Sequence, residues 1–283
     1  MFRSDKRAGT RRKPKGTKKK VADYKRRISI VSTLAIFIIV FSFVFAGSYY
    51  LLSTSIGGNS NANQIQDLHQ NQLDDGLLNA ALVDALYSRS PNLNFTASLR
   101  ETLQQESFKV DVYQGEDVTV DFLEKFACGY ELIILRMHSA LSNNNELYLF
   151  TAEPYSAGKY VQEQYLRLVK EAYPTEDSQS VFAVNWGFVK RLMTGKFNGT
   201  LVVVMGCDGA DDPWMAEEFM NQGAVGYVGW NGSVLLSHSD KAVLNLVQAL
   251  YVDKLSLEDA VKKTNSLIGE DPQWGSILNY RIR

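Results

Sequence analysis

The sequence feature that most constrains the fold is an uninterrupted apolar segment near the amino terminus. No charged residue lies between Arg27 and Asp67, and Ile28–Leu52 is a run of 25 almost wholly apolar residues. A helix needs about 20 such residues to cross a bilayer, whereas buried core helices are usually shorter and carry a polar stripe. The segment therefore predicts a transmembrane helix, with Tyr49 and Tyr50 at its far interface.

A cleavable signal peptide is the alternative interpretation, because Ala46-Gly47-Ser48 offers small residues after the apolar run. The 27-residue basic segment that precedes the apolar run argues against a signal peptide. The apolar run is also longer than the apolar core of signal peptides, which is about 7 to 15 residues. We therefore expect an uncleaved signal anchor over residues 28–52.

The net charge of −1 conceals two parts of opposite charge. Residues 1–27 hold 13 Lys or Arg and 2 acidic residues, or +11, and the remainder holds 17 basic and 29 acidic residues, or −12. Basic residues beside a span are retained in the cytoplasm. We expect a single-pass membrane protein with a basic cytoplasmic tail over 1–27 and an extracytoplasmic carboxyl-terminal domain.

The basic tail also predicts contact with anionic lipid headgroups, because it adjoins the membrane. A nucleic-acid-binding arm is the competing interpretation of the same charge. Tyr24 is the one aromatic residue among the basic ones, so base stacking has no support and no nucleic-acid partner is expected.

Beyond the span, residues 53–77 are rich in Ser, Asn, Gln and Gly and predict a flexible linker. Residues 78–283 alternate short β-rich runs with amphipathic segments, which predicts an α/β domain with a mostly parallel sheet covered on both faces. The expected strands of this sheet are Ala80–Leu86, Phe108–Tyr113, Leu132–Met137, Thr200–Met205, Ala224–Gly229 and Ser276–Tyr280. Thr200–Met205 is almost wholly apolar and is expected at the centre.

Helices are expected between these strands. They cover Thr96–Gln105, Asp117 to Gly129, Asp212–Gly223, Ser239–Tyr251 and Leu257–Leu267. Asp212 is expected to cap the amino terminus of its helix, and Pro213 is expected at the first helical position. An insertion of about sixty residues follows the third strand and is expected to hold strands Leu147–Thr151 and Ser180–Asn185 and a helix over Ala157–Ala172.

Two potentially reactive side chains follow neighbouring strands of the predicted sheet. His138 follows Leu132–Met137, and Cys207 follows Thr200–Met205. Sites in parallel sheets form beyond the carboxyl ends of the strands. A thiol beside an imidazole can perform nucleophilic acyl transfer, because the imidazole accepts the thiol proton and later protonates the leaving amine.

Structural roles for these two residues are the alternative, since cysteine is commonly buried and inert. A disulfide between Cys128 and Cys207 is a second alternative for an extracytoplasmic domain. However, Cys128 is expected at the amino edge of the sheet and Cys207 at the carboxyl edge. A strand of six residues separates these edges by roughly 20 Å, which exceeds the limit of about 7 Å between bridged Cα atoms.

This order of elements resembles the caspase-haemoglobinase fold, the cysteine peptidases that include caspases, metacaspases, clostripain, gingipains and CHAT domains. His138 follows the third strand and Met205-Gly206-Cys207-Asp208-Gly209 follows the fourth, as the family's catalytic segments do. Residues 219–230 are most similar to the gingipain and CHAT branch. The resemblance covers about residues 78–270 and implies a three-layer caspase-like sandwich.

The resemblance implies that Cys207 is the nucleophile and His138 the general base and acid. It also implies an oxyanion hole made by the backbone N–H groups of Cys207 and Ser139. The family commonly has Gly where this chain has Ser139, and no third member of a triad is evident.

For the substrate, Met205 stands where caspases have Gln, so an Asp-selecting pocket is not expected. Asp208 and Asp211 could attract a basic residue, although Asp208 could also simply face water. Trp230 and Asn231 are candidate pocket walls, with a core position as the alternative for Trp230.

No phosphate-binding loop, dinucleotide fingerprint or paired metal-ligand spacing occurs, and no cofactor is expected. Calcium binding is left open by the acidic residues between Asp208 and Asp212. Glycosylation sequons stand at Asn94, Asn198 and Asn231.

The sequence thus predicts a membrane-anchored cysteine endopeptidase that cleaves a peptide or protein substrate outside the cytoplasm. The alternative is a catalytically inactive caspase-like domain that acts as a binding or scaffold module. A third hypothesis is a different three-layer α/β fold in which His138 and Cys207 are core residues.

Overall fold

The computed structural model describes residues 77–126 and 128–283. The predicted tail, transmembrane helix and linker lie outside the described residues, except that Leu77 ends the linker. Among the helices that the structure describes, none has both the length and the hydropathy needed to span a bilayer.

The centre of the described part is a six-stranded sheet with the strand order β10-β9-β8-β3-β1-β2. Five strands are parallel, and β10 pairs antiparallel with β9 at one edge. The strands are β1 (Leu78–Asp84), β2 (Phe108–Gln114), β3 (Leu132–Arg136), β8 (Leu201–Val204), β9 (Gly226–Trp230) and β10 (Leu278–Ile282). The α/β class and the mostly parallel sheet are therefore confirmed.

The apolar β8 lies between β3 and β9, as its composition predicted. All four of its residues are buried. Side chains alternate between the two faces of a strand, so Val202 and Val204 join one apolar cluster whereas Leu201 and Val203 join the other. The sheet thus has a hydrophobic core on each face.

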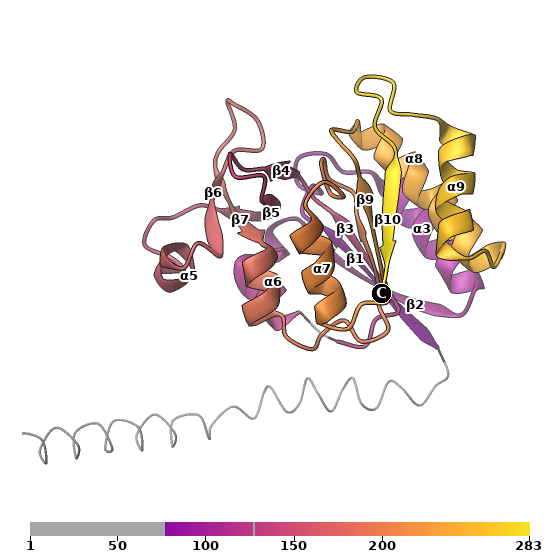
Figure 1. Ribbon diagram of the computed structural model, residues 1–283, viewed down its shortest axis with the longest axis horizontal. Coiled ribbons are helices and arrows are strands. Elements are labelled where there is room, and N and C mark those ends of the chain that lie inside the picture. Colours follow the sequence, from indigo (N-terminus) through magenta and orange to yellow (C-terminus); the bar gives the residue numbers. More distant parts are fainter. Residues whose placement is uncertain (1–76, 127) are drawn as a thin grey trace, which may run out of the picture. The chain divides into compact units, whose positions relative to one another are not determined.

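Helices cover both faces of this sheet (Figure 1). One face packs against α3 (Leu93–Gln105), α8 (Leu236–Val247) and α9 (Leu257–Ile268), and the other against α4 (Val120–Lys125), α6 (Trp186–Leu192) and α7 (Pro213–Asn221). A single π-helical turn, Gln248–Val252, follows α8, and a 3₁₀ turn, Gly115–Asp117, precedes α4. The architecture is therefore a sheet between two helical layers.

The segment between β3 and β8 forms a second, antiparallel sheet beside the first (Figure 1). Its order is β4-β5-β7-β6, and its strands are β4 (Ser139–Leu141), β5 (Leu147–Pro154), β6 (Val169–Ala172) and β7 (Val181–Asn185). The short helix α5 (Val161–Tyr165) precedes β6. The second sheet starts immediately after His138, so it borders the candidate site.

The helix expected over Ala157–Ala172 is present only as the short α5, and the prediction was wrong for the residues that form β6. Tyr160 and Arg167 adopt positive φ angles of 53° and 58°, which interrupt a right-handed helix on both sides of α5. Val169 is buried by pairing with β7 rather than on a helix face. Pairing of β6 with β7 therefore determines the structure of these residues, although their apolar side chains have the spacing of a helix.

Other element boundaries also differ from the prediction. The helix expected from Asp117 begins at Val120, because the Thr119 hydroxyl caps it by accepting the Phe122 N–H at 3.0 Å. The helix α6 was not predicted, although Asn185 caps it in the usual way by accepting the Phe188 N–H.

The predicted cap of α7 is confirmed. Asp212 Oδ1 accepts the Trp214 N–H at 2.8 Å, and Pro213 is the first helical residue. The second oxygen, Oδ2, accepts the Leu147 N–H at 2.8 Å. The same carboxylate therefore joins the helix after Cys207 to the second sheet.

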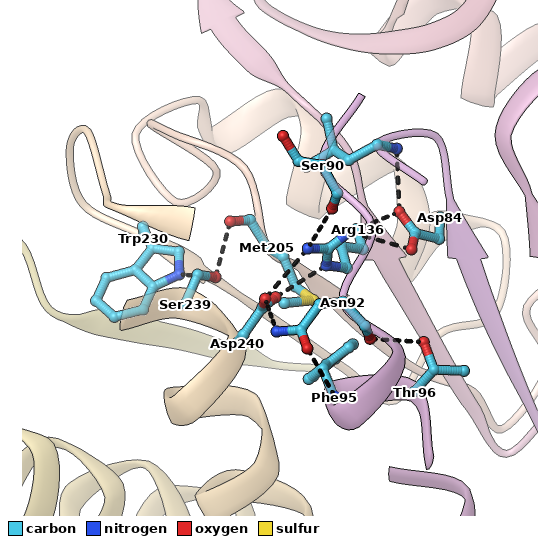
Figure 2. A network of polar contacts seen from close by, with 11 residues as sticks. Asp84, Ser90, Asn92, Phe95, Thr96, Arg136, Met205, Trp230, Ser239 and Asp240 are labelled. Atoms are coloured by element: carbon cyan, nitrogen blue, oxygen red, sulfur yellow. Dashed lines mark hydrogen bonds and ion pairs between the residues drawn. The ribbon is translucent and has the colours of Figure 1, made fainter. Parts of the chain in front are cut away.

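A buried ionic network lies at the carboxyl edge of the sheet (Figure 2). Arg136 ends β3 with 0% of its surface exposed. Its Nη1 donates to Asp84 at the end of β1, and its Nε donates to Asp240 in α8, both at 2.9 Å. Its Nη2 donates to the Ser90 carbonyl at 3.1 Å. Burial raises the pKa of Asp84, and the Arg136 guanidinium acts against that rise.

Two neighbours extend the network to other strands. Asn92 donates to Asp240 at 2.8 Å while its Oδ1 caps α3. Ser239 accepts the Trp230 Nε1–H at 3.0 Å and donates to the Met205 carbonyl at 2.9 Å (Figure 2). The ends of β1, β3, β8 and β9 are thereby connected to α8.

Replacing Arg136 by Met should strongly destabilise the domain, because two buried carboxylates would lose their cation. We expect the free energy of unfolding to fall by about 3–5 kcal/mol, measured by urea unfolding of the full chain. The control Lys125→Ala removes the exposed ion pair with Asp121 and should leave the unfolding curve unchanged. A loss no larger than that of the control would contradict the structural importance of the network.

Candidate functional site

The site is built where β3 and β8 end. These strands are parallel neighbours, and Leu135 pairs with Val204 in register. His138 lies three residues after Leu135, and Cys207 lies three residues after Val204. Since neighbouring strands lie about 4.8 Å apart, both residues are positioned at the same edge of the sheet.

The segments that carry these two residues are in direct contact. The Ser139 hydroxyl donates to the Cys207 carbonyl at 2.6 Å. A Cβ atom at Gly206 would lie 2.6 Å from the Met137 carbonyl oxygen and 2.9 Å from the Ser139 nitrogen. Only glycine allows the two backbones to approach this closely.

Cys207 is half-buried and Cys128 is exposed, and neither forms a disulfide. The Val234 N–H donates to the Cys207 sulfur at 3.4 Å, and the thiol lies 3.9 Å from the Val234 carbonyl. Within the part of the chain that the structure describes, no hydrogen bond joins this sulfur directly to the His138 ring. The hydrogen-bond partner of the sulfur is therefore the Val234 backbone.

The His138 imidazole is half-buried and packs 6.4 Å from the Phe150 ring, measured between centroids. Burial lowers the pKa of His138, and the nearby Arg89 cation lowers it further. A pKa below the usual histidine value keeps the ring neutral at pH 7. The imidazole is therefore in the state that can accept a proton.

The backbone N–H of Ser139 does not pair with the neighbouring strand β5. The Phe150 N–H donates to the His138 carbonyl at 2.9 Å, so Ser139 and Leu149 form a pair without mutual hydrogen bonds. The Ser139 N–H therefore points away from β5, towards the side on which Gly206 lies.

The predicted substrate-binding residues divide into two groups. Met205 and Trp230 are packed in the core, with 3% and 0% of their surfaces exposed, so the structure does not support them as pocket walls. Asp208 is half-buried at a positive φ of 58°, and Asp211 is exposed. Burial raises the pKa of Asp208, and Asp211 adds to that rise.

Asn231 is exposed, and its side-chain oxygen accepts the Ile277 N–H at 2.7 Å. Within residues 77–126 and 128–283, no three His, Cys, Asp or Glu side chains gather closely enough to hold a metal ion. Asp212, at the end of the acidic segment, uses both carboxylate oxygens on backbone N–H groups.

Sequence reasoning missed the Arg136 network. A signal for it was present, because an arginine inside the apolar run Leu132–Met137 must find buried partners. The partners themselves carried no signal, since Asp84 and Asp240 lie 52 and 104 residues away in the chain.

Replacing Gly206 by Ala should disturb the contact between the two segments, because the added methyl group meets backbone atoms. We expect a loss of about 1–3 kcal/mol in the free energy of unfolding, the usual cost of overpacking. Gly158→Ala is the matched control, because a Cβ atom there meets nothing within 4 Å. Equal unfolding curves for both variants would contradict the described approach of the backbones.

Replacing Arg89 by Gln should raise the pKa of His138, because a nearby cation disfavours the imidazolium ion. As the pH falls, the variant ring should take up its proton before the wild-type ring does. NMR titration of the His138 ring in chains that carry Cys207→Ala measures this directly. Because burial persists, the pKa should stay below the usual histidine value; an unchanged titration would exclude Arg89 as a cause.

Comparison with models of protein families and with curated proteins finds no match to this chain. The resemblance to caspase-like peptidases therefore rests on the residues His138 and Cys207 and on the order of the elements around them.

Proposed function

We propose that this protein is a membrane-anchored cysteine endopeptidase that hydrolyses peptide bonds outside the cytoplasm. Cys207 is its nucleophile, and His138 is its general base and acid. The observation that carries the proposal is the register of β3 and β8, which puts both residues three positions beyond the pair Leu135–Val204.

In the proposed reaction, the neutral His138 ring accepts the Cys207 proton while the sulfur attacks the carbonyl carbon of the scissile bond. The N–H groups of Ser139 and Cys207 stabilise the oxyanion. The imidazolium then protonates the leaving amine as the C–N bond breaks, which leaves a thioester. His138 next removes a proton from water while the oxygen attacks the thioester carbon. The C–S bond then breaks, the imidazolium returns its proton to the sulfur, and the acyl product leaves as a carboxylic acid.

The topology of the main sheet supports the resemblance to the caspase-like peptidases. The order of elements expected from that family recurs here, with the histidine after β3, an insertion, and the cysteine after β8. The candidate residues lie at the carboxyl edge, where sites of parallel sheets form. The finer assignment, a three-layer caspase-like sandwich, belongs to this proposal.

The proposed mechanism requires the Cys207 sulfur to meet the His138 ring in the complex with substrate. In the described structure the hydrogen-bond partner of this sulfur is the Val234 backbone. Catalytic hydrogen bonds in structures without substrate are often long or absent and form only in the complex.

A catalytically inactive binding or scaffold module is the second candidate. The contact of the Cys207 sulfur with the Val234 backbone favours it, because a thiol held there acts as a packed core group. This candidate predicts a thiol that does not react with peptide-like electrophiles.

The location of the domain follows from the apolar run 28–52 and the basic residues before it. The proposed orientation keeps residues 1–27 in the cytoplasm beside anionic lipid headgroups. The substrate is then a peptide or protein met outside the cytoplasm, with neither nucleic acid nor a cofactor required. Calcium dependence is left open.

A thiol-directed peptidyl probe, such as a peptidyl chloromethyl ketone, should label the full chain at Cys207, because an activated thiol attacks the probe. Labelling should disappear in Cys207→Ala and persist in Cys128→Ala, and His138→Ala should slow it about 100-fold or more, as expected for loss of a general base. Mass spectrometry of the labelled peptide measures the site. Absent labelling in the wild-type chain would favour the inactive module.

A further inference from the structure

A cavity of about 180 Å³ lies between the end of β1 and the second sheet. Leu86 and Arg89 come from the loop after β1, and Phe150 and Ala152 come from β5. His138 also lines it, so the cavity adjoins the candidate general base. It is therefore close enough to the proposed reaction to receive part of the substrate.

The cavity lies on one particular side of the candidate dyad. Among the described residues, its lining includes His138 but excludes Cys207, whose sulfur contacts Val234 instead. In the proposed reaction the sulfur bonds to the acyl group, whereas the imidazole protonates the leaving amine. The cavity is therefore on the side of the leaving group, the peptide that follows the scissile bond.

Seven of the thirteen residues that line the cavity are apolar, and Leu86, Phe150 and Val181 are among the buried ones. The polar lining residues are Ser88, Arg89, Glu116, His138, Thr151 and Gln179. Thr151 also lines the cavity, but its hydroxyl already donates to the Phe182 carbonyl at 2.8 Å. A charged side chain inside would lose its hydration without gaining a buried partner, which is unfavourable.

The size of the cavity suits one side chain. An apolar cavity of about 150 Å³ is known to hold a benzene ring, and this one is slightly larger. Arg89 and Glu116 line it as well, but both are exposed and have opposite charges. They contribute no net charge that would select an acidic or a basic residue.

We propose that this cavity binds the side chain of the first residue after the scissile bond and selects a medium-sized apolar side chain such as leucine. The inference rests on the proposed function, because it assigns the leaving-group side from the role of His138. It adds a substrate preference that the roles of His138 and Cys207 do not contain.

The test uses the full chain in detergent micelles and peptides that differ only in the residue after the scissile bond. Leucine there should raise kcat/KM about tenfold or more over glycine, the usual effect of filling an apolar pocket. Ala152→Leu fills the cavity and should abolish this preference. Ala157→Leu adds the same atoms at an exposed position and should retain it.

Each of two results with the glycine and leucine peptides would overturn the inference while leaving the proposed function intact. One is cleavage with equal kcat/KM for glycine and leucine, and the other is a leucine preference that survives in Ala152→Leu. A preference for aspartate would also overturn it, because Arg89 rather than the apolar walls would then select the substrate. Normal labelling of Ala152→Leu by the peptidyl probe confirms that the variant is folded.

A second measurement tests the cavity without catalysis. The amides of Leu-Gly-Gly and Gly-Gly-Gly represent the leaving peptide, and NMR shifts of the His138 ring in Cys207→Ala report their binding. Binding of the leucine peptide alone, lost when Ala152→Leu is added, supports the cavity even if the wild-type chain cleaves nothing. Equal shifts with both peptides, or none, would overturn the assignment.

Discussion

The ion pairs of Arg136 with Asp84 and Asp240 are the interaction on which the carboxyl edge of the sheet depends. Three buried charges are costly to remove from water, so each must keep its partners. Arg136 stands two residues before His138 in the chain. Ser239, which precedes Asp240, donates to the carbonyl of Met205, and Met205 stands two residues before Cys207. One network thus anchors the bases of both segments that carry the candidate site.

The parallel core could be predicted because β8 and most of β3 are apolar on both faces, a pattern that can be recognised from the local sequence alone. In the second sheet, β5 and β7 were expected as strands, but β6 was not, because its pairing with β7 overrides a local helical spacing in the same residues. Among the site residues, His138 and Cys207 were predictable from the strand ends. Met205 could have been assigned to the core, since it shares the face of Leu201 and Val203.

The surroundings of the two candidate catalytic residues differ. Cys207 packs against the cluster that α3, α8 and α9 build on one face of the sheet. His138 faces a cavity that the second sheet completes. The two candidate residues therefore border different packed regions, although the contact of the Ser139 hydroxyl with the Cys207 carbonyl joins their segments.

Asp212 gives the second sheet a mechanical connection to the nucleophile segment. One of its oxygens caps α7 and the other holds Leu147, the first residue of β5. If the second sheet moved away from the main sheet, α7 would retain its cap only by following, and the segment Asp208–Asp212 would be pulled with it. A load applied to the second sheet would therefore reach the residues next to Cys207 through this carboxylate as well as through the Ser139 hydroxyl on the Cys207 carbonyl.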